Sequence, residues 1–186
     1  SSVTFADKKN INDDFSPALT DYPSDPANIE AEWGRGRADE RYRFTSSAVI
    51  RLPARFTLSP IFEYGSGQPW NRRYGYDYNG DGKSADRKAG VAKFSEDGPN
   101  FASINLRVTY GLPLGQSARA DLIAEFFNMT NRVNYDVNSL TVNGAEFLSG
   151  PTLQNPAAAA VANPNYRKYT ATLPPFEAQL GVRVTF

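Results

Sequence analysis

The sequence predicts an all-β chain of about six antiparallel, up-and-down strands that form part of a larger transmembrane β-barrel with long extracellular loops. Three observations support this fold class. Apolar and polar residues alternate with period two in several segments, no segment has a convincing helical period, and short connections alternate with long ones. The chain contains no run of about 18 apolar residues, which excludes a transmembrane helix.

The segment from Phe176 to Phe186 is the most regular of these strands. Apolar residues stand at every even position, and the odd positions between them hold Glu, Gln, Gly, Arg and Thr. Because successive side chains of a strand point to opposite faces, one face of this strand is apolar and the other is polar. A tilted strand needs about this number of residues to cross a bilayer.

The same alternation recurs in four upstream segments, and Val3 and Phe5 end a further strand. The four segments are Arg41–Leu52, Arg55–Ser66, Phe101–Gly111 and Ala118–Asn128. The smallest closed barrels of one chain have roughly eight strands, and unpaired strand edges are costly in lipid. We therefore expect the missing strands to come from the rest of a longer polypeptide or from neighbouring copies.

The connections between these segments alternate in length. Pro53-Ala54 and Pro113–Ser117 are short turns, whereas residues 8–40, 67–99 and 129–175 are long excursions. Outer-membrane barrels have short periplasmic turns and long extracellular loops in this order. We expect a periplasmic C-terminus, extracellular long loops and a location in the bacterial outer membrane.

A soluble β-sandwich is the alternative fold, because its strands alternate in the same way. This alternative accounts less well for long irregular loops, which are uncommon in compact soluble domains. It also gives no special reason for the charged residues in the middle of the strands, such as Arg107, Glu125 and Arg183. The barrel is the preferred interpretation, and the sandwich stays open.

The composition excludes several classes of function. The chain has 20 basic and 20 acidic residues, so its zero net charge does not favour a nucleic-acid partner. It contains neither cysteine nor histidine, which removes disulfides, thiol nucleophiles, histidine bases and the commonest zinc ligands. Asp13 and Asp14 form a carboxylate pair, but no nucleophile accompanies them, and we expect a solvated loop. No enzymatic activity is predicted.

A loop beginning at residue 77 resembles the start of a calcium-binding loop of the EF-hand type. Oxygen-bearing residues stand at positions one, three and five, and Gly82 at position six allows a sharp turn. The candidate Ca²⁺ ligands are Asp77, Asn79, Asp81, Lys83 through its carbonyl, and Asp86. Position twelve is Lys88 in place of the usual Glu, and a hydrophilic turn selects the same residue types. Both interpretations stay open.

Several longer segments resemble a known family. They are EWGRGRADERYRFTSSAVIRLP (32–53), SGQPW (66–70), DYNGDGKSADR (77–87), ADLIAEFFNMTNRVNY (120–135) and LGVRVTF (180–186). With these segments the chain resembles the C-terminal region of TonB-dependent outer-membrane transporters, especially the Oar-like branch. The segments occur in family order and are spread over most of the chain, from residue 32 to residue 186.

The resemblance implies a barrel around an N-terminal plug, energised by the inner-membrane partner TonB, for uptake of a nutrient or peptide. The plug, the TonB-contacting region and the first strands are expected outside this sequence. The expected partners are outer-membrane lipid, the remaining strands and plug, TonB, and the barrel-assembly machinery, whose recognition signal the aromatic Phe186 resembles. A non-transporting surface or adhesion barrel and a soluble calcium-stabilised β-domain are the alternative functions.

Two further groups of side chains have competing interpretations. Charged residues on the predicted polar face either line a permeation path, bind the plug or pair with one another across strands, which is our default expectation. They are Arg51, Arg55, Glu63, Arg107, Glu125 and Arg183. Trp70, Tyr74 and Tyr76 lie near a strand end, where we expect an aromatic girdle at the outer interface in preference to a ligand platform.

Overall fold

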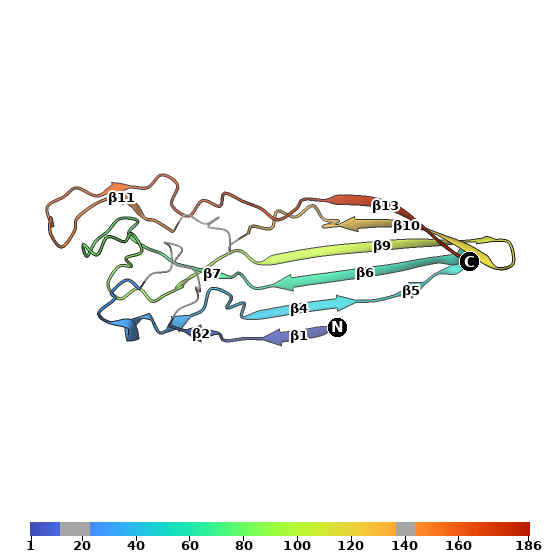
Figure 1. The fold of residues 1–186 in the computed structure, drawn as a ribbon, viewed down its shortest axis with the longest axis horizontal. Helices are drawn as coiled ribbons and strands as arrows, with labels where there is room; N and C mark the ends of the chain where they lie inside the picture. The colour runs from blue at the N-terminus through green and yellow to red at the C-terminus, as the bar shows by residue number, and fades with distance from the viewer. Residues whose placement is uncertain (12–22, 137–143) are drawn as a thin grey trace.

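The main body of the molecule is one open antiparallel sheet, as a computed structural model describes it for residues 1–11, 23–136 and 144–186. Its strands are β1 (Ser2–Phe5), β4 (Tyr42–Ser47), β5 (Ile50–Arg51), β6 (Phe56–Gly65), β9 (Phe101–Leu114), β10 (Ala118–Phe127) and β13 (Glu177–Thr185). They follow the order β1-β4-β6-β9-β10-β13, with β5 also paired to β6 (Figure 1). The expected all-β, antiparallel fold class is therefore confirmed.

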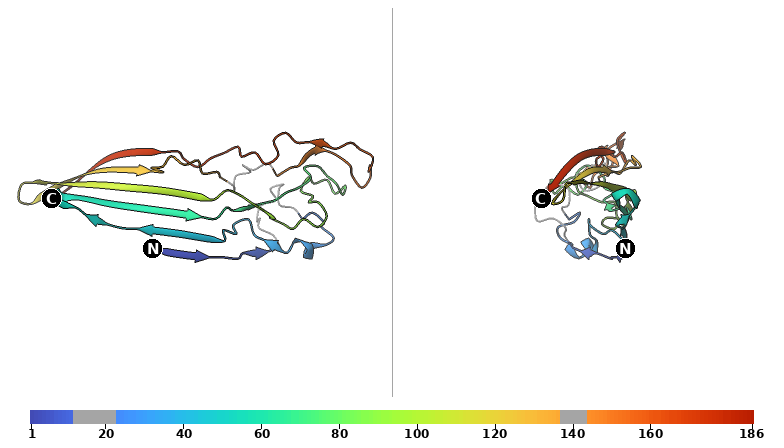
Figure 2. Two further views of the ribbon diagram at one scale, coloured as in Figure 1. Left: turned by 180° about the vertical axis from the view of Figure 1, so that it is seen from behind. Right: turned by 90° about the vertical axis from the view of Figure 1, so that its right-hand side faces the viewer.

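The two edges of this sheet are unpaired within the described part of the chain. β1 pairs with β4 alone and β13 pairs with β10 alone, so the described strands form no closed barrel. Seen along its length, the sheet is curved and not flat (Figure 2).

Apolar side chains form continuous rows across one face, which we call the apolar face. Each row contains residues that pair directly on neighbouring strands. Two of the rows are Phe56–Tyr110–Leu122–Val182 and Leu58–Val108–Ala124–Leu180. The rings of Phe56 and Tyr110 lie 4.7 Å apart within the first row, the separation expected of paired aromatic side chains. Towards the β13 edge the face is open to solvent, with Leu180 87% and Val182 66% exposed.

The opposite, polar face also has rows of directly paired residues, although Ile61 and Ile123 lie on it as well. Ser59, Arg107, Glu125 and Gln179 pair in sequence from β6 to β13. The same register holds along each pair of strands, so the two faces stay separate over the whole length of the sheet.

The expected strand Arg41–Leu52 is interrupted. It appears as β4 and β5, with Ala48 and Val49 between them, although the register against β6 is the same on both sides of the gap. The gap lies opposite Pro60 of β6, whose carbonyl accepts a hydrogen bond from Ala48 N at 3.2 Å. Because proline has no N–H to return a second bond, the ladder breaks there.

The expected boundary between β9 and its turn is also wrong. β9 continues to Leu114, so Pro113 belongs to the strand and pairs with Arg119. The other neighbour of β9 ends where Phe56 pairs with Tyr110, so no partner on that side needs an N–H from Pro113. The turn itself is short, and Gly115 adopts a positive φ of 81° in it.

Short and long connections lie at opposite ends of the sheet (Figures 1 and 2). The turn end contains η2 (Pro53–Arg55) and the turn at Gly115. Three long connections follow β1, β6 and β10, and their described residues, 6–11 with 23–41, 66–100, and 128–136 with 144–176, lie at the loop end. The expected alternation of connection lengths is confirmed.

Where the structure describes them, the long connections contain only short elements. These are β2 (Lys9–Asn10), η1 (Ile29–Glu32), β3 (Gly34–Arg35), β7 (Pro69–Trp70), β8 (Glu96–Asp97), β11 (Phe147–Ser149) and β12 (Val161–Ala162). None of the described helices is long and apolar enough to span a membrane.

Three asparagines join the ends of β9, β10 and β13. The amide of Asn134 donates to Ala102 O at 2.8 Å and accepts from Ala102 N at 3.0 Å, in the way that a neighbouring strand would. Asn128 closes its own turn through Arg132, and Asn131 Oδ1 accepts from Phe176 N at 3.0 Å. Asn128 and Asn131 both have positive φ, which asparagine adopts more readily than most residues.

Candidate functional site

The polar face of the sheet carries most of the charged side chains of the strands, and most of them pair across strands. Arg43 lies 3.7 Å from Glu63, and Arg107 lies 3.6 Å from Glu125. The expected cross-strand pairing is confirmed for Glu63, Arg107 and Glu125.

Asp121 is the most buried carboxylate of this face, and it pairs with two arginines. Its Oδ2 accepts from Arg183 at 2.7 Å across β10 and β13, which confirms the pairing expected for Arg183. Its Oδ1 accepts from Arg119 at 2.6 Å. Arg51 and Arg55 differ from the other charged residues that were expected on the polar face, because neither forms an ion pair with any described residue. The positive charge of the face is therefore concentrated at the turn end.

A hollow of about 230 Å³ opens where the polar face meets the long connections. Glu40, Arg43, Ser66, Gln68, Pro99, Phe101, Tyr135, Asp136 and Leu173 line it. Arg43 donates to Glu40 at 3.2 Å, so a paired cation and anion face the space. The ring of Tyr135 packs against the tilted ring of Tyr169, with 4.5 Å between the ring centroids. Aromatic walls with a few charged groups are typical of sites for small polar ligands.

Buried and half-buried ion pairs connect the three long connections to one another. Glu32 and Arg87 pair at 2.7 Å with side chains only 4% and 7% exposed, which joins the first connection to the second. Arg72 forms a bidentate pair with Glu146, and Glu96 pairs with Arg167, which joins the second to the third. The second connection is therefore the one that forms ion pairs with both of the others.

Asp39 organises the base of the first connection. Its side chain is fully buried, and its carboxylate accepts from Lys8 N at 2.9 Å and from Arg35 at 2.9 Å, with Arg41 at 3.0 Å. Burial raises the pKa of this carboxyl, but the Lys8 amide, Arg35 and Arg41 outweigh that effect and leave the pKa below its ordinary value. Asp39 is therefore held as an anion at neutral pH.

The loop at residues 77–86 is closed by its own side chains. Asp77 accepts from the amides of Gly80, Asp81 and Gly82, and Asp81 accepts from Lys83 N at 2.8 Å. In the described part of the chain no three carboxylates come close enough together to hold a metal ion. Carbonyl and amide oxygens also bind calcium, so the Ca²⁺ site stays a prediction.

Asp86 and Asn79 have positions within this loop that the sequence did not predict. The Asp86 carboxylate is 2% exposed and accepts from the amides of Tyr78 and Asn79, at 2.6 and 3.1 Å. Asn79 Nδ2 also bonds to Asp86 and to Ser24 O, which attaches the loop to the first connection. Burial raises the pKa of Asp86, with contributions from the charges of Asp81 and Asp77.

The expected aromatic girdle is wrong for Trp70. Its side chain is 7% exposed and packs against Tyr166 and the guanidinium of Arg167, inside the long connections. Tyr74 and Tyr76 lie 5.5 Å apart, and Tyr74 stacks on Tyr78 at 4.8 Å. Because these rings pack against one another, they hold the second connection together.

Phe186, Asp13 and Asp14 are the remaining residues that the sequence singled out. Phe186 is 95% exposed at the turn end, where it contacts little of the chain, and its expected role as an assembly signal stays a prediction. Asp13 and Asp14 lie outside the described residues.

Sequence reasoning missed the three asparagines and the Glu32–Arg87 pair. The asparagines belong to the segment FNMTNRVNY, whose repeated Asn residues after a strand are the signal for side-chain capping of backbone groups. No comparable signal marks Glu32 and Arg87, because 55 residues separate them.

Comparison of the chain with protein-family models, with curated proteins and with solved structures finds no match.

Proposed function

We propose that the chain is the C-terminal part of an outer-membrane barrel of the TonB-dependent type, which takes up a nutrient or peptide ligand. In this proposal the apolar face contacts lipid, the polar face lines the interior, and the loop end is extracellular. The turn end and Phe186 lie in the periplasm, where the barrel-assembly machinery would recognise the closing strand.

The apolar face is the observation that carries this proposal. Its rows run without interruption from β6 to β13, and the side chains nearest the β13 edge are the most exposed. A soluble monomer rarely exposes a contiguous apolar surface of this extent. In lipid the same surface needs no cover, whereas the paired charges of the polar face stay in an aqueous interior.

The open edges of β1 and β13 support a larger assembly. Their unpaired backbone groups would each cost several kcal/mol in a bilayer, so they need partner strands. The remaining strands of a longer polypeptide are the simplest source of such partners.

The uptake role draws support from the arrangement of the polar face. The hollow of about 230 Å³ lies at the loop end, and charged rows lead from it to the turn end. A ligand captured among the long connections would therefore meet a polar route through the barrel.

Two single-cysteine variants on β13 test the membrane proposal. The natural chain has no cysteine, so Leu180→Cys and Gln179→Cys each introduce one unique thiol on neighbouring residues of opposite faces. In native membranes we expect a membrane-impermeant maleimide to label Gln179→Cys, and to label Leu180→Cys only after the membrane is dissolved. Ser95→Cys, at an exposed position in the second connection, is the positive control. Equal labelling of both β13 thiols in water, without detergent, would favour the soluble calcium-stabilised domain instead.

Ligand uptake separates the transporter from a surface or adhesion barrel. Cells that carry the whole parent protein should accumulate its ligand, and deletion of TonB should abolish that accumulation. Binding to cells that is unaffected by loss of TonB would indicate an anchor whose long connections bind a partner.

A further inference from the structure

The turn end of the polar face contains two adjoining hollows. One has a volume of about 780 Å³ and extends from β5 to β10, and the other, of about 460 Å³, lies between β10 and β13. Both are lined by Gln116, Ala118 and Arg119. We call the two together the basic hollow, because its charged lining residues are Arg51, Arg55, Arg119, Arg183 and the single carboxylate Asp121.

The charges of the basic hollow do not balance. Asp121 uses one oxygen for Arg119 and the other for Arg183. Arg51 and Arg55 form no ion pair with any residue that the structure describes, although the arginines farther along the face, Arg43 and Arg107, do so. The turn end therefore has cationic donors that lack an anionic partner.

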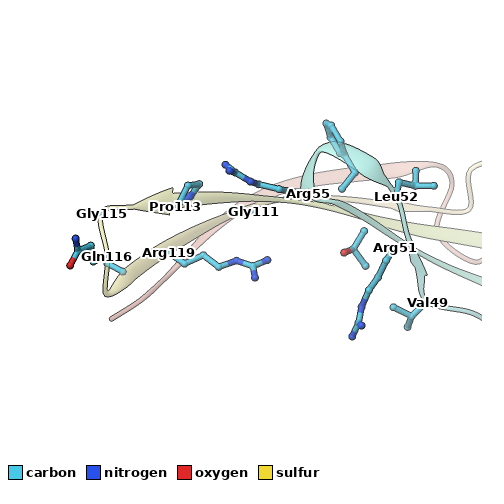
Figure 3. Close-up of a pocket in the computed structure, with 12 residues that line it drawn as sticks. Val49, Arg51, Leu52, Arg55, Gly111, Pro113, Gly115, Gln116 and Arg119 are labelled. Atoms are coloured by element: carbon cyan, nitrogen blue, oxygen red, sulfur yellow. The ribbon is translucent and has the colours of Figure 1, made fainter.

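The side chains of the hollow are spread out and do not meet at one point. Figure 3 shows Arg51 and Arg55 extending in different directions, with Arg119 lying apart from Arg51. Arg119 lies over Gly111, where an added Cβ would come within 2.6 Å of its Nη2. Because Gly111 has no side chain, the guanidinium of Arg119 stays close to the sheet and the hollow stays open.

The spacing of the cations decides which kind of anion fits. Arg51 is on β5 and Arg183 is on β13, so four strand spacings, roughly 19 Å, separate their backbones. A small anion such as phosphate reaches only one of these arginines or one close pair. An extended polypeptide rises about 3.3 Å per residue, so about six residues span the same distance. Each carboxylate along it can receive the planar fork of one arginine.

We propose that the basic hollow binds an extended acidic polypeptide segment that crosses the turn end of the polar face. Carboxylates along the segment pair with Arg51 and Arg55, and with the guanidinium N–H groups of Arg119 and Arg183 that do not bond to Asp121, and the wide opening of the hollow admits the main chain. The hollow belongs to the polar face itself, so this inference does not depend on the proposed transport role.

A labelled peptide tests the inference directly. The probe is a fluorescein-labelled octapeptide of alternating Glu and Ser, titrated with the full chain in a nonionic detergent and followed by fluorescence anisotropy. We expect saturable binding that weakens between 50 and 300 mM NaCl, because salt screens exposed charges. The same peptide with Gln in place of Glu should not bind.

Variants at two arginines locate the binding. Arg51→Gln should weaken binding of the acidic peptide about fivefold, and Arg51→Lys should restore part of it. Arg132→Gln removes an exposed arginine at the loop end, whose guanidinium donates to Asn100 O, and should leave the affinity unchanged. Circular dichroism of each variant checks that the sheet is intact.

Three results would overturn the inference. The first is a lack of saturable binding to the natural chain, and the second is an equal loss with Arg132→Gln and Arg51→Gln. The third is displacement of the peptide by pyrophosphate at concentrations as low as those at which the peptide itself binds, which would indicate a site for small anions.

Discussion

At the scale of single residues, buried polar side chains decide how the strands begin and end. Asn134 is the clearest case, because its amide replaces a missing neighbour strand opposite Ala102. It is 3% exposed, so its loss would leave both backbone groups of Ala102 without a protein partner and without easy access to water.

Replacement of Asn134 should therefore destabilise the sheet. We expect Asn134→Ala to lower the free energy of unfolding by about 1–3 kcal/mol, the cost of leaving buried backbone groups unsatisfied. Urea unfolding in detergent, followed by tryptophan fluorescence, measures this change. Asn165→Ala is the control, since Asn165 is exposed, and it should change the stability by less than about 0.5 kcal/mol. Equal effects of the two substitutions would refute the role assigned to Asn134.

Asp39 predicts a pH dependence of the first connection. A carboxyl whose pKa is lower in the folded state stabilises the fold above its unfolded pKa, about 3.9, and this contribution is lost as the pH falls through the folded value. We expect the exchange protection of the Lys8 amide, corrected for intrinsic rates, to fall as the pH is lowered below about 4. In Asp39→Asn the protection should be lower at pH 6 and nearly independent of pH. The same acid-dependent loss in Asp39→Asn would assign it to another group.

At the scale of elements, the strands were largely predictable and the long connections were not. Period-two alternation places residues on faces without any knowledge of the partner strand, and β13 matches the predicted segment to within one residue at each end. The errors at Pro60 and Pro113 arose because the effect of a proline depends on whether the neighbouring strand needs its N–H.

The candidate site within the connections was less accessible to sequence reasoning. Position and spacing identified the loop at residues 77–86, but Asp86 proved to be a buried acceptor of backbone amides. Arg72 and Glu146 are 74 residues apart, and nothing in a local pattern indicates such a partner. Trp70 was misassigned for the same reason, because its contacts with Tyr166 come from a distant segment.

The calcium prediction concerns the loop at residues 77–86. If the loop binds Ca²⁺ through Asp77, Asn79 and Asp81, the ion should protect the trypsin sites at Lys83, Arg87 and Lys88 from cleavage. We expect Asp81→Ala to abolish the Ca²⁺-dependent part of that protection. Ser84→Ala, at a neighbouring exposed position, should preserve it. Equal cleavage of the natural chain with and without Ca²⁺ would rule out the site and leave a hydrophilic turn.

At the scale of the whole molecule, the sheet and the long connections are organised by different forces. The sheet keeps its two faces apart through an unbroken register, so its interior positions tolerate neither insertion nor deletion. The connections depend instead on specific ion pairs between distant segments. In the proposed barrel the sheet provides the surface that contacts lipid, and the connections provide the surface that first contacts the ligand.

The central place of the second connection has a consequence for how the protein can evolve. Glu32 is buried against Arg87. A change of charge at either position therefore leaves the other charge unpaired in a site from which water is excluded. Neutral drift at these positions therefore requires paired substitutions, and the same holds with less force for Arg72 and Glu146. Among natural variants, the three connections should diversify together as one inherited unit, while exposed residues such as Leu148 and Leu153 vary independently.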